Sequence, residues 1–136
     1  MTNLKAVIVD EERLARISLR RLLEHISEIE ITGEANSCES ALELINRDKP
    51  QVIFLDLQLH GETGFDLLEL IDNAINIIFV TAYDENAFRA FKVNAFDYLS
   101  KPVNPDRLRE AIEKVKSRES TPKSEARLFE YSGNFA

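Results

Sequence analysis

Three short apolar runs constrain the fold of this chain more than any other feature, because no polar residue alternates with the apolar ones. They are residues 6–9 (AVIV), 52–55 (VIFL) and 77–80 (IIFV). β-Branched and aromatic residues favour strands, and neither face of these runs is polar, so each run predicts a strand covered on both sides. Such strands are typical of a parallel sheet between two layers of helices. Weaker strand signals lie at residues 30–35 and 97–99.

Helical periodicity fills the intervals between these strands. A first helix is predicted from apolar residues at i, i+4, i+7, i+8 and i+11, which are Ala15, Leu19, Leu22, Leu23 and Ile26. The charged side chains of Arg16, Arg20 and Glu24 are then expected to face water. A third helix is predicted after Gly64. The predicted N-terminal caps of the others are Ser37 for the second helix, Asp84 for the fourth and Asn104, followed by Pro105, for the fifth.

The predicted elements alternate as five strands and five helices, which indicates an α/β domain with a parallel sheet. A chain of 136 residues suits one domain with a short tail. We expect that domain to occupy residues 1–117. Residues 118–136 are expected to hold a polar linker and then, near residues 128–134, the beginning of a further domain that is too short to fold alone.

Composition and charge exclude several classes of protein. Hydrophobic residues make up 44% of the chain and charged residues 30%, without an apolar run near the roughly 18 residues of a membrane span or the layout of a signal peptide. No membrane association is expected, and the predicted location is the cytoplasm. Cys38 is the single cysteine, so no internal disulfide can form. The net charge is −7, and DNA binding by this chain alone is not expected.

Polar residues gather where the predicted strands end. Asp10 and Glu11 follow the first strand, Asp56 the third, Thr81 ends the fourth, and Lys101 follows the fifth. In an open α/β sheet, ligands bind beyond the carboxyl ends of the strands, so these side chains are predicted to share one site.

This set of groups suits phosphoryl transfer. Clustered carboxylates repel one another unless a cation joins them, which predicts bound Mg²⁺ or Mn²⁺. A carboxylate oxygen of Asp56 can attack phosphorus, while Lys101 supplies a cation and Thr81 a hydrogen-bond donor. An acid after a strand is by itself more often a solvated loop residue. It is the combination, in this order at successive strand ends, that favours a site.

Taken together, these segments resemble the signature of response-regulator receiver domains. The resemblance covers about residues 4–117 and is carried by residues 8–12 (IVDEE), 54–58 (FLDLQ) with Gly61 and Gly64, 79–82 (FVTA) and 98–102 (YLSKP). Residues 81–84 (TAYD) and 95–99 (AFDYL) are similar to receivers of the LytTR type, whose separate C-terminal domain binds DNA.

The resemblance implies a fold and a set of site residues. The fold is flavodoxin-like (CheY-like), a five-stranded parallel sheet of order 2-1-3-4-5 flanked by five helices. Asp56 is implied as the phosphoacceptor, assisted by Lys101 and Thr81, with Thr81 and Tyr98 as a switch pair and a cis Lys101–Pro102 bond. The implied metal ligands are Asp10, Glu11, Asp56 and the backbone carbonyl of Gln58.

The resemblance also implies partners. A sensor histidine kinase would donate the phosphoryl group, and a homodimer would form through the face of helix 4, strand 5 and helix 5. DNA would be bound only by a C-terminal LytTR domain, so that phosphorylation would regulate transcription. Glu11 stands where a second Asp is usual, which keeps the charge and lengthens the arm.

Two other functions stay open. The first is a phosphohydrolase that turns over through an aspartyl phosphate, although haloacid dehalogenase-like proteins normally carry a second Asp two residues after the nucleophile, where this chain has Gln58. The second is a receiver-like interaction module that is never phosphorylated. Such a module would lack the acceptor or the lysine, and Asp56 and Lys101 are both present.

Overall fold

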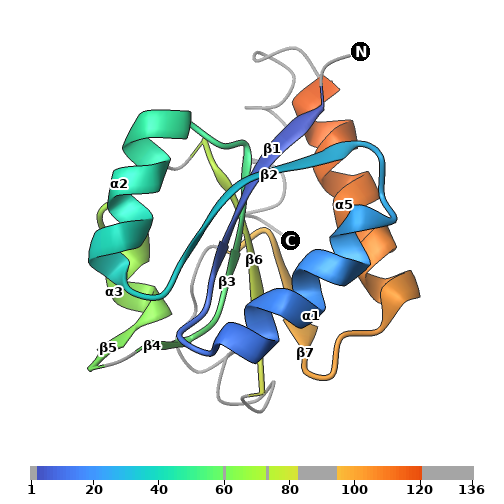
Figure 1. Cartoon of the computed structure of the whole chain (residues 1–136). Helices are drawn as coiled ribbons and strands as arrows, with labels where there is room; N and C mark the ends of the chain where they lie inside the picture. The colour runs from blue at the N-terminus through green and yellow to red at the C-terminus, as the bar shows by residue number, and fades with distance from the viewer. Residues whose placement is uncertain (1–2, 60, 73, 83–94, 121–136) are drawn as a thin grey trace, which may run out of the picture.

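A computed structural model describes residues 3–59, 61–72, 74–82 and 95–120 of the chain. The strands are β1 (Leu4–Val9), β2 (Ile29–Ala35), β3 (Val52–Leu55), β4 (Gln58–Leu59), β5 (Glu62–Thr63), β6 (Asn76–Thr81) and β7 (Asp97–Ser100). The helices are α1 (Arg13–Glu24), α2 (Cys38–Asp48), α3 (Gly64–Leu68) and α5 (Pro105–Ser120). Figure 1 shows three layers, with α2 and α3 on one face of the sheet and α1 and α5 on the other.

The large sheet has the order β2-β1-β3-β6-β7, and every strand pair in it is parallel. The short strands β4 and β5 form a separate antiparallel pair. Counting only the strands of the large sheet, its order is the predicted 2-1-3-4-5, and the flavodoxin-like fold is confirmed. Because β1 and β3 are neighbours with Val9 opposite Leu55, the next residues, Asp10 and Asp56, leave the sheet side by side.

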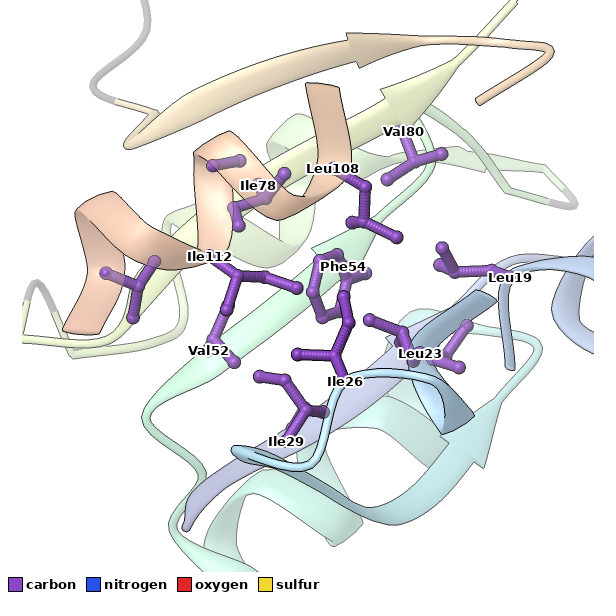
Figure 2. Close-up of a cluster of buried hydrophobic side chains, with 14 of the residues drawn as sticks. Leu19, Leu23, Ile26, Ile29, Val52, Phe54, Ile78, Val80, Leu108 and Ile112 are labelled. Carbon is purple, nitrogen blue, oxygen red and sulfur yellow. The ribbon is translucent and has the colours of Figure 1, made fainter. Parts of the chain in front are cut away.

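The two faces of the sheet carry separate apolar cores, because successive side chains of a strand point to opposite faces. Every residue of β3 and β6 is buried, as the three unalternating runs predict. In Figure 2, Leu19 and Leu23 of α1 and Leu108 and Ile112 of α5 surround Phe54. The other face packs against α2 and α3 through Val7, Val9, Ile53, Leu55, Ile77, Phe79, Cys38, Ala41, Ile45 and Leu67.

Two predicted helix caps are confirmed. The Ser37 hydroxyl accepts a hydrogen bond from the Ser40 amide at 3.2 Å at the start of α2. Asn104 Oδ1 accepts from the amides of Asp106 and Arg107, at 2.8 and 3.1 Å, before α5 begins at Pro105. These contacts satisfy amide groups that the first turn of a helix leaves without a partner.

The solvated face predicted for α1 is wrong for Arg16, while Glu24 is exposed and the Arg20 side chain is 37% exposed. Both arginine side chains pair with Glu34 of β2, and the Arg16 side chain is only 16% exposed. The prediction failed because periodicity along one helix does not show an acidic partner on a neighbouring strand.

The last helix runs further than the predicted domain end at residue 117. It continues to Ser120, because Arg118 donates to Asn76 Oδ1 at 2.8 Å and the Asn76 amide donates to Glu119 at 3.1 Å. The predicted fourth helix with its cap Asp84, and the tail from residue 121, lie outside the described residues. Within the described ranges, none of the helices is both long and apolar enough to cross a membrane.

Candidate functional site

The candidate site lies at the carboxyl edge of the sheet, where Asp10 and Asp56 directly follow β1 and β3. The two residues are buried, with exposed fractions of 5% and 6%. Their main chains are held to the sheet, since the Asp10 amide donates to Ala35 at 3.0 Å and the Asp56 amide donates to Val9 at 2.9 Å. Two carboxylates are thus fixed next to each other in a largely apolar setting, where an unpaired charge is costly.

Lys101 joins these two carboxylates. Its Nζ atom lies 2.7 Å from Asp10 Oδ2 and 2.8 Å from Asp56 Oδ2. The residue follows β7 directly, and its amide donates to the Thr81 carbonyl at 2.9 Å, which extends the pairing of β6 with β7 by one step. The Lys101–Pro102 peptide bond is cis, as the resemblance implied.

The other oxygen of each aspartate accepts a backbone amide. Asp10 Oδ1 accepts from Glu12 at 2.9 Å, and Asp56 Oδ1 accepts from Gln58 at 3.1 Å. Each carboxylate is therefore oriented by one amide and one ammonium group.

The pKa values at the site follow from this crowding. Burial raises the pKa of Asp10 above its ordinary value, and the neighbouring Asp56 adds to the increase, while Lys101 and the Glu12 amide act against it. Burial also opposes the charged form of Lys101, but its hydrogen bonds to Asp10 and Asp56 outweigh that effect and raise the Lys101 pKa. The lysine is thus held as a cation.

The predicted switch residues lie on adjacent strands. Thr81 ends β6 and is 1% exposed. Tyr98 of β7 is partly buried against the core beneath α2 and α3, and it stands opposite Phe79 in the register of β6 with β7. The Thr81 carbonyl accepts the hydrogen bond of the Lys101 amide, so Thr81 lies at the same edge of the sheet as the two aspartates.

The predicted metal ligands are only partly brought together. Among the described residues, no three Asp, Glu, His or Cys side chains converge closely enough to hold a metal ion, so Glu11 does not complete a cluster with Asp10 and Asp56. The two aspartates do supply paired hard oxygen atoms, the chemistry that Mg²⁺ and Mn²⁺ require. The donor set therefore fits a divalent cation, while the complete ligand set stays a prediction.

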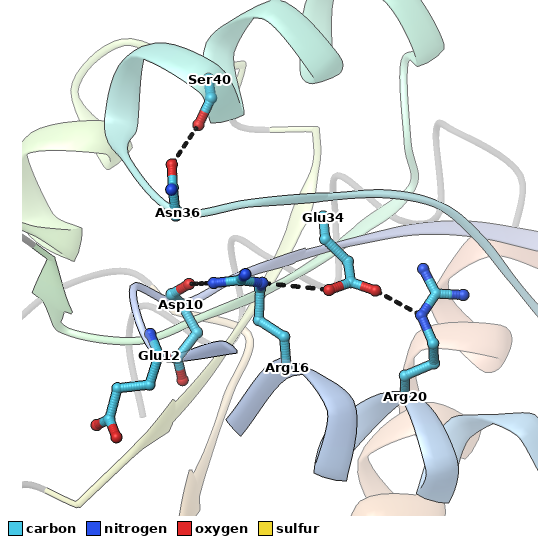
Figure 3. A network of polar contacts seen from close by, with 7 residues as sticks. All are labelled: Asp10, Glu12, Arg16, Arg20, Glu34, Asn36 and Ser40. Carbon is cyan, nitrogen blue, oxygen red and sulfur yellow. Dashed lines mark hydrogen bonds and ion pairs between the residues drawn. The ribbon is translucent and has the colours of Figure 1, made fainter. Parts of the chain in front are cut away.

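Sequence reasoning missed one residue at this edge. Arg16 Nη1 donates to the main-chain carbonyl of Asp10 at 2.7 Å, and Figure 3 shows the same guanidinium also pointing at Glu34. Its position one turn inside α1 was a weak signal of a role at the site, because the same helical spacing is found for any arginine on a solvent-facing helix surface.

Comparison with known proteins decides what kind of domain carries this site. Residues 6–113 match the family of the response regulator receiver domain. The chain belongs to that family.

The receiver is also similar to individual proteins. It is 41% identical to the sensory transduction protein LytT of Bacillus anthracis over 121 residues, which cover 87% of this chain and 49% of LytT. It is 37% identical to the transcriptional regulatory protein BtsR of Escherichia coli strain K12 over 119 residues, or 86% of this chain and 50% of BtsR. The similarity to LytT agrees with the predicted LytTR type. The receiver spans about half the length of these relatives.

Solved structures confirm the fold. The receiver domain of AraT, a response regulator from Geobacillus stearothermophilus, superposes with a TM-score of 0.73 at 34% identity, over 85% of this chain and 94% of that one. A two-component response regulator of the LuxR family from Aurantimonas sp. SI85-9A1 superposes with a TM-score of 0.76 at 28% identity, over 84% and 85%.

Proposed function

We propose that this receiver accepts a phosphoryl group on Asp56 from a phosphorylated sensor histidine kinase and passes the signal to an output. One observation carries the proposal. The Lys101 ammonium contacts Asp56 at 2.8 Å and Asp10 at 2.7 Å, at the sheet edge where open α/β sheets bind their ligands. A carboxylate beside a fixed cation and a second acid is suited to phosphoryl transfer, which depends mainly on positioning and charge neutralisation.

The proposed step is a displacement at phosphorus. A carboxylate oxygen of Asp56 forms a bond to phosphorus while the bond between phosphorus and the donor imidazole nitrogen breaks. The electron pair stays with that nitrogen, which is reprotonated from solvent, and the product is an aspartyl phosphate. Lys101 offsets the charge of the phosphoryl oxygens, and the Thr81 hydroxyl donates a hydrogen bond to one of them.

A divalent cation is proposed to take part. Mg²⁺ or Mn²⁺, when bound, neutralises further charge on the phosphoryl oxygens. The proposed protein ligands are Asp10, Glu11, Asp56 and the backbone carbonyl of Gln58. The paired carboxylates of Asp10 and Asp56 support their part of this set, because their oxygens already share one cation in Lys101. Glu11 and the Gln58 carbonyl are proposed from the resemblance alone.

The output is proposed to act through the surface of β7, α5 and the predicted fourth helix. Thr81 would move toward the phosphoryl group and Tyr98 would follow it inward, which biases this surface toward a partner or a second copy of the receiver. Because the relatives are about twice as long and include a transcriptional regulator, residues 118–136 are proposed to hold a linker and the start of a C-terminal LytTR domain that binds DNA, in a cytoplasmic protein.

The test is an intact-mass measurement after incubation with acetyl phosphate, with and without MgCl₂. The wild type should gain one phosphoryl group only with magnesium, and hydroxylamine should remove it. Asp56→Asn should gain none, while Asp72→Asn, which changes an exposed carboxylate far from the site, should behave as wild type. An unchanged wild-type mass contradicts the proposal. Repeated release of phosphate from small esters would favour the phosphohydrolase instead.

A further inference from the structure

We propose that Arg16 is a positioning residue for the acidic loop, residues 10–12, and that Glu34 holds its guanidinium in place. The inference deepens the proposed function and rests on it, because the loop carries the predicted metal ligands Asp10 and Glu11. It concerns how their main chain is held, and not the metal itself.

The Arg16 side chain connects three parts of the fold. From α1, its Nη1 donates to the Asp10 carbonyl at 2.7 Å and its Nε donates to Glu34 Oε1 of β2 at 3.2 Å. Figure 3 shows these two contacts on opposite sides of one guanidinium. The Arg16 side chain is 16% exposed and that of Glu34 is 26% exposed, so water screens the contacts only weakly.

Glu34 also pairs with a second arginine through its other oxygen atom. Its Oε2 accepts from Arg20 Nε at 2.5 Å, one turn further along α1. The next residue of β2, Ala35, accepts the Asp10 amide at 3.0 Å. The end of β2 therefore holds Asp10 twice, directly through the amide and through Arg16 at the carbonyl.

Every polar group of Asp10 consequently has a partner. Its amide and carbonyl bind Ala35 and Arg16, and its carboxylate oxygens bind the Glu12 amide and Lys101. The Asp10 carbonyl belongs to the peptide that joins Asp10 to Glu11. Loss of the Arg16 contact would release rotation of that peptide, and this rotation turns both predicted ligands.

The N-cap residue of α1 does not hold the loop through a side-chain cap. Among the described residues, Glu12 at that position makes no side-chain capping hydrogen bond. A guanidinium can donate in two directions from one rigid plane, whereas a lysine nitrogen is a single point. Arginine is therefore favoured at position 16. We expect Arg16→Lys to hold the acidic loop better than Arg16→Gln does and less well than the wild type.

The first experiment needs no metal. Amide hydrogen exchange is measured by NMR in metal-free wild type, Arg16→Gln and Arg20→Gln. Arg20→Gln is the matched control, because it removes an ion pair to the same Glu34 without a contact to Asp10. The Glu12 amide should exchange about tenfold faster in Arg16→Gln and at the wild-type rate in Arg20→Gln, since one hydrogen bond of a charged group is lost. If the Glu12 amide exchanges at the same rate in Arg16→Gln and Arg20→Gln, the inference is overturned.

The second experiment measures the affinity for Mn²⁺ from the electron paramagnetic resonance signal of the free ion. Arg16→Gln should weaken binding about tenfold, as for other residues that orient metal ligands, and Arg16→Lys should lie between it and wild type. Arg20→Gln should bind as wild type, and urea unfolding confirms that each variant folds. If Arg16→Gln binds Mn²⁺ as tightly as the wild type, the inference about Arg16 is wrong, and the proposed function is not affected. A wild type that neither binds Mn²⁺ nor gains a phosphoryl group defeats the proposed function, and hydrogen exchange still decides the role of Arg16.

Discussion

The Nζ atom of Lys101 lies 2.8 Å from Asp56 Oδ2, although 45 residues separate them in the chain. The contact crosses from the end of β7 to the end of β3, with β6 between them. It ties the proposed phosphoacceptor to a cation that is itself held to β6 through its amide. Stability and chemistry at this edge therefore depend on the same ion pair.

Removing the Lys101 ammonium should destabilise the fold. Lys101→Met leaves Asp10 and Asp56, each with a side chain 7% exposed, without their shared cation. Urea unfolding at neutral pH should show a loss of about 3 kcal/mol, and MgCl₂ should restore part of it. The control is Lys114→Met, because that side chain is 54% exposed and should cost less than about 1 kcal/mol. Similar losses in both variants would show that Lys101 contributes no more than a surface charge.

Asp97 should make stability depend on pH. Burial acts to raise its pKa, but hydrogen bonds from Arg107 and the Tyr98 amide outweigh that effect and lower it below the ordinary value. Because the pKa of Asp97 is lowered in the folded protein, its ionised carboxylate stabilises the folded state at pH values above the ordinary pKa. This contribution is lost as the pH falls through the lowered pKa.

The measurement is the free energy of unfolding of wild type and Asp97→Asn between neutral and acidic pH. The wild type should be more stable by about 1 kcal/mol near neutrality, since Arg107 is more than a third exposed. The difference should shrink below about pH 4. A difference that grows on acidification contradicts the assignment.

Gly64 should be needed for the position of Asp56. A Cβ atom at Gly64 would lie 2.6 Å from the Asp56 carbonyl oxygen and 3.2 Å from both Leu55 Cγ and Leu57 Cα, so it could not move away from the carbonyl without meeting other atoms. Gly64→Ala should therefore cost about 2 kcal/mol and slow phosphorylation by acetyl phosphate.

Gly61 offers the control for backbone strain alone. It has a φ of +69°, and among the described residues, its chain neighbours apart, none has an atom within 4 Å of a Cβ added there. Gly61→Ala should cost about 1 kcal/mol, with the phosphorylation rate unchanged. A slower rate in Gly61→Ala and an unaltered one in Gly64→Ala would reject the steric explanation.

Asn76 should hold the end of α5 against the sheet. Its side chain is fully buried, donates to the Gln51 carbonyl at 2.8 Å and accepts from Arg118 at 2.8 Å. Asn76→Ala should lower the free energy of unfolding by about 2 kcal/mol, because buried partners lose their hydrogen bonds. Hydrogen exchange in the last turn of α5 should accelerate. Ser120→Ala, which alters a hydroxyl in that turn, should change neither measurement.

Much of the fold and part of the site were predictable because they depend on local pattern. The runs at residues 6–9, 52–55 and 77–80 became β1, β3 and β6, since an apolar run without alternation is stable only when both faces are covered. Once a parallel sheet is inferred, the residues after its strands must share an edge. The sequence alone therefore predicts that Asp10 and Asp56 share one edge of the sheet.

The contacts of Arg16 were not predictable in the same way. Its spacing in α1 resembles that of any solvated residue, and its acceptors belong to the loop after β1 and to β2. Only the packing of the helix on the sheet brings Asp10 and Glu34 within reach. The same reasoning explains the end of α5, where a polar composition predicted a linker and Asn76 supplies the missing partner.

Within the described residues, the sequence by itself determined the alternation of strands and helices, the caps Ser37 and Asn104, and the group of residues at the sheet edge. These follow from residue type and spacing, which act over a few positions of the chain. Tertiary structure decided which oxygen each donor binds: Lys101 between two aspartates, and Arg16 between a carbonyl and Glu34. Such choices depend on distances between segments far apart in sequence, and only the packed sheet with its two helical layers sets those distances.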